Sequence, residues 1–178
     1  MACSGLWLEA FSPEYIGIPG QEVNLTVQVL NRNKSNVKLT KISYLNQSDT
    51  TCQLALKTND LYTFKRKEKL PESLPYSNPY WLNEDHSIGF YTVKNENLIG
   101  KPENESSTKI TFGITIEDIS LTIERNLVHK YTDPVKGEIY RPFEILPPVT
   151  VNIQEKVFVF TDTKPKTISL TIKANTAN

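Results

Sequence analysis

Alternation of apolar and polar residues with a period of two is the strongest pattern in this chain, and it restricts the fold to sheet structure. Between Glu22 and Leu30, the apolar residues Val23, Leu25, Val27 and Val29 alternate with polar ones. Successive side chains of a strand point to opposite faces of a sheet, so this segment is predicted to be a strand with one buried face. No segment has a convincing 3.6-residue period. The sequence therefore predicts an all-β protein.

The same pattern recurs at short, regular intervals. From Lys109 to Ile123 it runs forward, turns at Glu117-Asp118 and runs back, which predicts a hairpin. Short antiparallel strands at this spacing favour an immunoglobulin-like or fibronectin-III-like antiparallel β-sandwich. The basic run Lys65–Lys69 is expected to protect the edge of a sheet from pairing. Other strands are expected at Val37–Leu45, around Leu54 and Leu56, and at Leu61–Leu70, Val149–Ile153, Val157–Phe160 and Thr167–Lys173.

A proline-rich stretch from Asp133 to Thr150 interrupts this series. Four prolines fix their own backbone angles and push the preceding residues toward extended conformations, which excludes a helix or a central strand. The aromatic and aliphatic residues between the prolines would be wasted in a mobile linker. The stretch is therefore predicted to be an ordered, extended connector, with Tyr140 and Phe143 partly buried against a sheet.

Three parts are expected along the chain. Residues 1–131 form the sandwich, in which a long aromatic loop, 71–104, carries one short strand at Gly89–Val93. Residues 132–148 form the connector, and residues 149–178 are the opening strands of a further β-sandwich. Apolar strand residues lie very near the start, and a complete second sandwich needs more chain than remains. The chain is thus expected to be a piece of a longer protein.

Composition argues against two classes of partner. The chain carries 20 basic and 20 acidic residues, so it lacks the basic surface typical of nucleic-acid or anionic-membrane binders. It has no apolar run approaching the roughly 20 residues that span a bilayer. We therefore expect neither a nucleic-acid nor a membrane partner.

No catalytic, cofactor-binding or metal-binding residues are predicted. A catalytic zinc needs about three converging ligands, whereas the two histidines, His86 and His129, are far apart in the sequence. Neither a nucleophile elbow nor a phosphate-binding glycine loop is present. Cys3 and Cys52 could form one disulfide in an oxidising compartment, but two separate buried thiols are the favoured interpretation.

Aromatic residues in the long loop provide the one functional signal. Tyr76, Tyr80 and Trp81, with Tyr91 nearby, could form a stacking platform for a sugar ring or an anchor for another domain. The alternative is that Tyr80 and Trp81 fill the end of the sandwich while the prolines shape the loop. Both interpretations remain open at this point.

Three stretches resemble a known family. They are CSGLWLEA at Cys3–Ala10, SNPYWL at Ser77–Leu82 together with GKPEN at Gly100–Asn104, and YTDPVKGEIYRPFEILPPVTVN at Tyr131–Asn152. Together they are similar to the region that follows the catalytic domain in multidomain PIG-L/LmbE-like deacetylases of Bacteroidetes-type bacteria. Members of that family resemble N-acetylglucosaminyl deacetylases, which are zinc enzymes, and their extra domains are β-sandwiches.

This resemblance implies a role without catalysis. The His-Pro-Asp-Asp motif of such enzymes is absent, so no catalytic or zinc residue carries over to this chain. The implied function is a non-catalytic accessory module of a secreted or periplasmic sugar-acting deacetylase, with that protein's own deacetylase domain as partner. The alternative is a carbohydrate-binding module, and a hydrolase with an unfamiliar site is a third possibility. The residues expected to contact a domain or a sugar are Tyr76, Tyr80, Trp81, Asn83, Glu84 and Asn104.

Overall fold

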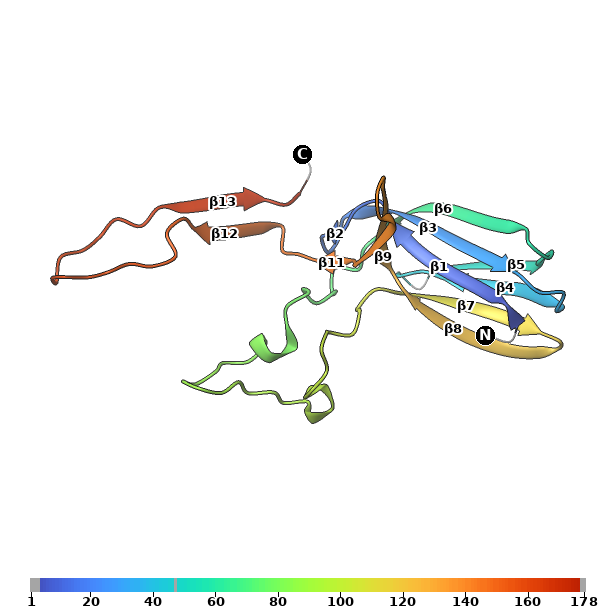
Figure 1. Cartoon of the computed structure of the whole chain (residues 1–178), viewed down its shortest axis with the longest axis horizontal. Coiled ribbons are helices and arrows are strands. Elements are labelled where there is room, and N and C mark those ends of the chain that lie inside the picture. The colour runs from blue at the N-terminus through green and yellow to red at the C-terminus, as the bar shows by residue number, and fades with distance from the viewer. Residues whose placement is uncertain (1–3, 47, 177–178) are drawn as a thin grey trace.

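The computed structural model describes residues 4–46 and 48–176 (Figure 1). Within these residues the protein is mostly β and contains no α-helix, which confirms the predicted class. Two short 3-10 helices, η2 (Tyr80–Leu82) and η3 (Glu96–Leu98), lie in the loop between β6 and β7. None of the helices described is long and apolar enough to cross a membrane.

The larger sheet has five strands in the order β10-β9-β1-β3-β6. β1 pairs antiparallel with β3 and parallel with β9, and β9 pairs antiparallel with β10. β6 is an edge strand, so the basic run Lys65–Lys69 lies at a sheet edge as expected. The strand bounds are β1 Leu6–Ser12, β3 Glu22–Asn31, β6 Leu61–Lys69, β9 Val128–Asp133 and β10 Gly137–Pro142.

The second sheet has four strands in the order β5-β4-β7-β8. The predicted hairpin is its β7–β8 pair, in which Ile116 lies opposite Ile119. Glu117 and Asp118 between them both have positive φ, 45° and 68°, which is the backbone of a type I′ turn. The strand bounds are β4 Val37–Ser43, β5 Asp49–Ala55, β7 Lys109–Ile116 and β8 Ile119–Asn126.

Buried side chains from both sheets form a single hydrophobic cluster. Leu25 and Val27 enter it from the five-stranded sheet, and Leu39, Ile42 and Phe112 enter it from the four-stranded sheet. Each Å² of apolar surface removed from water stabilises the folded state by about 25 cal/mol. Such a cluster is therefore the main favourable contribution to folding. The core thus uses the inward faces that the alternating sequence predicted.

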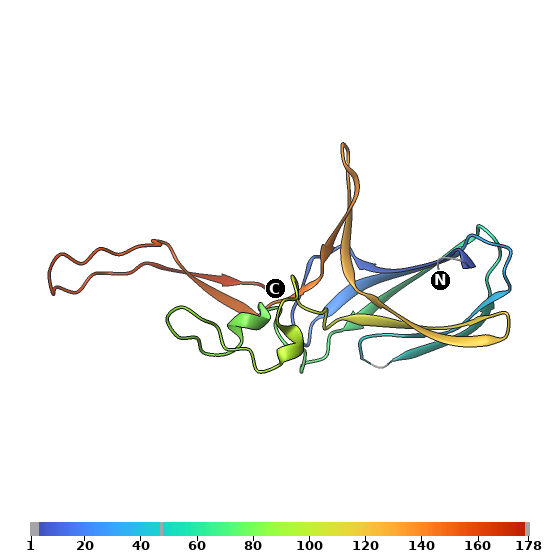
Figure 2. The same cartoon turned by 60° about the horizontal axis from the view of Figure 1, so that its bottom comes forward.

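Part of the proline-rich stretch is a strand, which the sequence did not predict. β9 and β10 form a hairpin that stands out from the body (Figure 2), and β11 (Glu144–Ile145) then pairs parallel with β2 (Ile16–Gly17). β10 can pair because it is an edge strand, where its last residue, Pro142, breaks no second ladder. Phe143 is buried as predicted, whereas Tyr140 is about half exposed. The limits proposed for the three parts of the chain stay a prediction.

Residues beyond Pro148 form a separate two-stranded sheet of β12 (Val149–Ile153) and β13 (Leu170–Ala174). The expected strand at Val157–Phe160 is wrong, and β13 begins three residues later than predicted. Alternation alone does not make a strand, because its backbone also needs a paired neighbour. Val157–Phe160 has none among the described residues.

The expected strand at Gly89–Val93 is wrong for the same reason. This segment contributes only an isolated bridge between Ser87 and Phe90. Among the described residues, no strand pairs with Gly89–Val93.

Of the two cysteines, only Cys52 lies within the described residues. Cys52 lies on β5 as a half-buried free thiol, and its burial raises the pKa of the thiol. Cys3 lies outside the described residues, so the expectation of two separate buried thiols stays a prediction.

Candidate functional site

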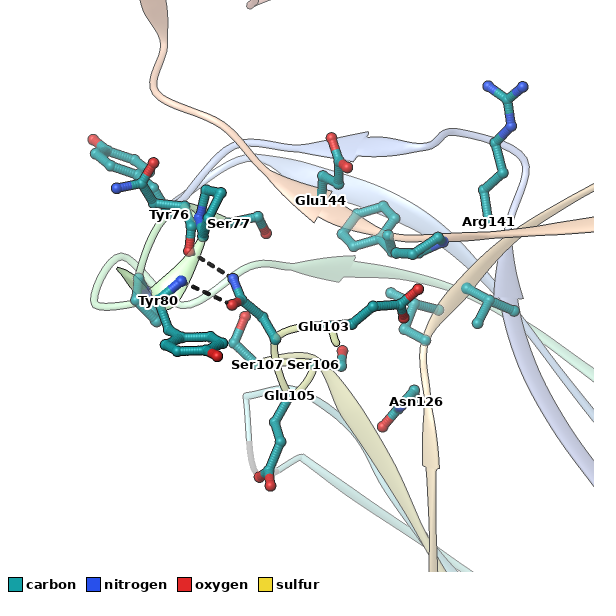
Figure 3. Close-up of a pocket in the computed structure, with 18 of the residues that line it drawn as sticks. Tyr76, Ser77, Tyr80, Glu103, Glu105, Ser106, Ser107, Asn126, Arg141 and Glu144 are labelled. Atoms are coloured by element: carbon teal, nitrogen blue, oxygen red, sulfur yellow. Dashed lines mark hydrogen bonds between the residues drawn. The ribbon is translucent and has the colours of Figure 1, made fainter. Parts of the chain in front are cut away.

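A groove of about 770 Å³ lies at one end of the two sheets. One wall is the long loop, from Pro75 to Ser107, and the opposite wall is the end of β10 with β11, from Tyr140 to Glu144. The junction of β8 and β9 at Leu127 lines it as well (Figure 3). Segments distant in the sequence therefore meet at this site.

Asn104 holds the long loop in shape from its far side. Its side-chain Oδ1 accepts a hydrogen bond from the Tyr80 amide at 3.0 Å, and its Nδ2 donates to the Asn78 carbonyl at 2.6 Å (Figure 3). The Tyr80 hydroxyl donates to the Lys101 carbonyl at 3.2 Å. The Asn104 side chain thus supplies hydrogen bonds to backbone groups of the loop that are not paired in a sheet.

The base of the loop is fastened to the sheet through Ser77. Its amide donates to the Ile145 carbonyl, and the Ile145 amide donates to the Ser77 hydroxyl, both at 2.8 Å. Ile145 is fully buried and pairs with Gly17. The loop therefore starts from a fixed point of the core.

Five of the six predicted contact residues line this groove. The exception is Glu84, which lies outside and forms an ion pair with Lys94 at 2.6 Å. The Asn83 side-chain oxygen accepts a hydrogen bond from Asn78 at 3.2 Å. The structure thus brings together Tyr76, Tyr80, Trp81, Asn83 and Asn104. The Asn83 side-chain oxygen, both side-chain polar atoms of Asn104 and the Tyr80 hydroxyl already have partners within the loop.

The three predicted aromatic rings differ in exposure. Tyr80 and Trp81 pack edge to face, with ring centroids 5.0 Å apart, and both are half-buried. Tyr76 is 53% exposed. The rings of Tyr80 and Trp81 are nearly perpendicular to each other, so these two rings do not form a flat platform on which a sugar could stack.

Sequence reasoning missed the opposite wall of the groove. Tyr140, Arg141 and Glu144 reach it only because β10 and β11 pair with β9 and β2. Their only signal in the sequence is a set of polar side chains between prolines, which does not indicate a site. Glu103, on the loop wall, also lines the groove.

Four large apolar side chains project from the long loop into solvent. We call Ile88, Phe90, Tyr91 and Ile99 the loop patch. They are 103%, 68%, 55% and 63% exposed, respectively. Single exposed apolar residues are ordinary, but several on one loop are typical of a contact surface.

Neither histidine belongs to a metal-binding group within the described ranges. His86 lies on the exposed loop, with its ring 5.5 Å from that of Tyr91. His129 lies on β9, stacked 5.3 Å from Tyr131, and its Nδ1 is 3.2 Å from the Ser12 carbonyl oxygen. These contacts give both rings packing roles.

Lys130 holds the β9–β10 hairpin against β1. Its Nζ lies 3.1 Å from both a Glu9 and a Glu138 carboxylate oxygen. Burial lowers the pKa of Lys130, but hydrogen bonds to Glu138 and Glu9 and the charge of Glu9 outweigh it, so the pKa is raised. The ammonium also lies within 6 Å of the rings of Trp7, Phe11 and Tyr140.

This cluster predicts a loss of stability in alkali. Burial, with hydrogen bonds to Glu9 and Glu138, raises the pKa of Tyr140 from 10.0 to about 12. Both raised pKa values, of Lys130 and Tyr140, favour the folded state below pH 10.0, and this stabilisation is lost as the pH rises toward 12. The effect is small, because water screens the half-exposed Tyr140 ring.

Urea unfolding midpoints across this pH range test that prediction. Tyr140→Phe should flatten the alkaline slope, and difference absorbance between the two proteins should report the Tyr140 titration directly. An identical slope in wild type and Tyr140→Phe would contradict it.

The fold and the groove define a mostly β protein with an aromatic-lined depression between a long loop and a hairpin. No known protein family and no curated protein matches the sequence. One solved structure is similar: the Pseudomonas fluorescens alkylpurine DNA glycosylase AlkC bound to DNA containing an abasic-site analogue. Sequence identity is 9% and the TM-score is 0.28, with 70% of this chain and 30% of that chain covered. At this score the likeness carries no argument about fold or function.

Proposed function

We propose that this protein is a non-catalytic accessory module that packs on another folded domain through the loop patch. The resemblance to PIG-L-like deacetylases supports such a domain as the partner, in a secreted or periplasmic sugar-acting protein. The observation that carries the proposal is the loop patch itself. Large apolar side chains stand in water on a loop whose backbone is held by internal hydrogen bonds.

We further propose that the two large sheets form an immunoglobulin-like sandwich of the fibronectin-III type. The strand orders β1-β3-β6 and β5-β4-β7-β8 match A-B-E and C′-C-F-G of that arrangement. Their shared hydrophobic cluster supports the same conclusion. In such domains, loops at the sandwich ends make contacts, and the loop between β6 and β7 is at one end.

A loop whose backbone is held by internal hydrogen bonds suits docking, because it loses less conformational entropy on binding. Tyrosine, as at Tyr91, is among the residue types that dominate the energy of protein interfaces, and phenylalanine, as at Phe90, is enriched at their cores. By contrast, Asn83, Glu84 and Asn104, expected to bind sugar hydroxyls, already bind loop partners. This internal satisfaction favours a domain over a sugar as the ligand.

The sugar-binding alternative is supported by the groove rather than by the patch. Tyr76 is exposed there, and Arg141, Glu103 and Glu144 line the same groove with charged groups. Such a site would bind an amino-sugar polymer by stacking on Tyr76 and Trp81.

The docking proposal is tested by titrating this chain with a PIG-L-like deacetylase domain in a calorimeter. Wild type is expected to bind, and the double variant Ile88→Ser/Phe90→Ser should weaken binding roughly tenfold or more. Val135→Ser is the matched control, since Val135 is 92% exposed at the tip of the β9–β10 hairpin, away from the loop. It should bind like wild type.

Equal binding by all three proteins would remove the loop patch from the interface, and no binding by wild type would remove the proposed partner. A Trp7→Phe background isolates Trp81, because the chain has only these two tryptophans. A fluorescence change of Trp81 with chitosan oligomers would instead support the sugar-binding alternative. Zinc-dependent release of acetate by this chain would overturn the non-catalytic role.

A further inference from the structure

Lys130 places its ammonium group against the outer face of the five-stranded sheet. On that face, Trp7, Glu9 and Phe11 alternate along β1 with residues of the hydrophobic core, so their side chains point outward together. The Lys130 Nζ atom lies 5.9 Å and 4.9 Å from the ring centroids of Trp7 and Phe11. It lies 3.1 Å from a Glu9 carboxylate oxygen.

Strand β10 closes the other side of this arrangement. Tyr140 lies directly opposite Lys130 in the β9–β10 pair, and its ring centroid is 5.5 Å from Nζ. One Glu138 carboxylate oxygen is 3.1 Å from Nζ, and the other accepts a hydrogen bond from the Tyr140 hydroxyl at 2.9 Å. We call the three rings and two carboxylates around Nζ the ammonium cage; its members are Trp7, Glu9, Phe11, Glu138 and Tyr140.

The chemistry of the cage selects a cation with N–H donors. Carboxylates form strong hydrogen bonds with charged donors, and the faces of aromatic rings attract a cation. These interactions strengthen where water is excluded, and the side chains of Lys130 and Glu9 are only 13% and 8% exposed, while Glu138 lies at the rim. Without a cation, the cage would hold two like charges, one of them buried.

We infer that the cage is a binding site for primary alkylammonium groups and that Lys130 is its built-in ligand. A free alkylammonium ion can then occupy the cage once the Lys130 side chain is truncated. The occupant is defined by the structure, because an ammonium group is seated among the five cage residues. In the wild-type protein the site is full and binds no free amine.

The built-in ligand also ties the β9–β10 hairpin to the sheet. β9 pairs with β1 at Phe11–Val128 and Ser12–His129, and the hairpin projects beyond these positions (Figure 2). The Lys130 ammonium adds a link from Glu9 of β1 to Glu138 of β10. The inference depends on the cage residues alone and not on the function proposed for the loop patch.

Chemical rescue of Lys130→Ala tests the inference. This variant should exchange the amide hydrogens of the hairpin roughly tenfold faster than wild type or more, because the tie to β1 is lost. Adding n-propylammonium, whose carbon chain and ammonium group match the removed atoms, should restore most of the protection. We expect rescue at about 50 mM, since a free ligand must replace a tethered one whose effective concentration is on the order of millimolar.

Two controls separate charge from space filling. The neutral alcohol n-propanol has the same carbon chain and should restore no protection. Lys136→Ala, at an exposed lysine in the turn of the same hairpin, should exchange like wild type with and without the amine. The amine should also shift the Trp7 indole resonance of Lys130→Ala and leave that of wild type unchanged.

Two further measurements cover a variant that fails to fold. If Lys130→Ala is unfolded in buffer, n-propylammonium but not n-propanol should refold it, because a ligand that binds the folded state stabilises it. In wild type, acetic anhydride should modify Lys130 roughly tenfold more slowly than Lys136, because the caged amine is charged and shielded. Equal rescue by amine and alcohol, rescue by neither, or equal acetylation of the two lysines would overturn the inference.

Discussion

Glu68→Leu is expected to lower the free energy of unfolding by about 3 kcal/mol. Glu68 is 3% exposed on the inward face of edge strand β6. Its carboxylate forms an ion pair with Arg66 Nε at 2.8 Å and accepts hydrogen bonds from Ser48 Oγ at 2.8 Å and from the Asn46 amide at 3.4 Å. Leucine would leave these three groups without their carboxylate partner. The loss falls at the lower end of the range for buried ion pairs, since the Arg66 side chain is 36% exposed and can turn toward water.

Two further variants isolate the cause. Glu68→Leu/Arg66→Leu should recover most of the loss, because it removes both charges and adds apolar surface. Glu124→Leu, which breaks an exposed ion pair with Lys109 at 3.4 Å, should change stability by less than about 1 kcal/mol. Urea unfolding measures all three, and a loss no larger for Glu68→Leu than for Glu124→Leu would contradict the prediction.

Phe143→Ala is expected to cost about 3–5 kcal/mol, as for other large aromatic truncations in a core. Phe143 is buried directly over Gly17, where an added Cβ would lie only 2.6 Å from the ring. The ring also lines the groove between the hairpin and the long loop. Its loss leaves a cavity at the point where β11 pairs with β2.

The close approach of Gly17 to Phe143 provides a sharp control. Gly17→Ala alone should destabilise the protein, because Leu70 and the ring leave no room for a methyl group. In the double variant Gly17→Ala/Phe143→Ala, that methyl fills part of the cavity, so the two losses should not add. Phe90→Ala, at an exposed ring, should cost little. Additive losses in urea unfolding would show that the two residues are not coupled.

The candidate site was predictable on one side only. Tyr76, Tyr80, Trp81 and Asn104 lie in one loop, and the density of aromatic residues and prolines there signals an ordered excursion. Their hydrogen bonds were not predictable. That Asn104 binds the Tyr80 amide rather than a ligand depends on how the loop folds back on itself.

Local pattern determined which segments are strands, because alternation in one segment is a property of that segment alone. It determined β3, the β7–β8 hairpin and the inward faces that make the core. It failed at Gly89–Val93 and Val157–Phe160, where the chain alternates or is apolar but forms no strand ladder among the described residues.

Only the tertiary structure decided which strands pair. In the tertiary structure, part of the proline-rich stretch pairs with β9 as edge strand β10, and Phe143 is buried in the core. This arrangement places Arg141 and Glu144 across a groove from the long loop. The tertiary structure also leaves the large apolar side chains of β12 and β13 exposed. Strand pairing and side-chain burial both require contact between segments that are distant in the sequence. Their energies therefore depend on how the whole chain folds, and no single segment of the sequence determines them.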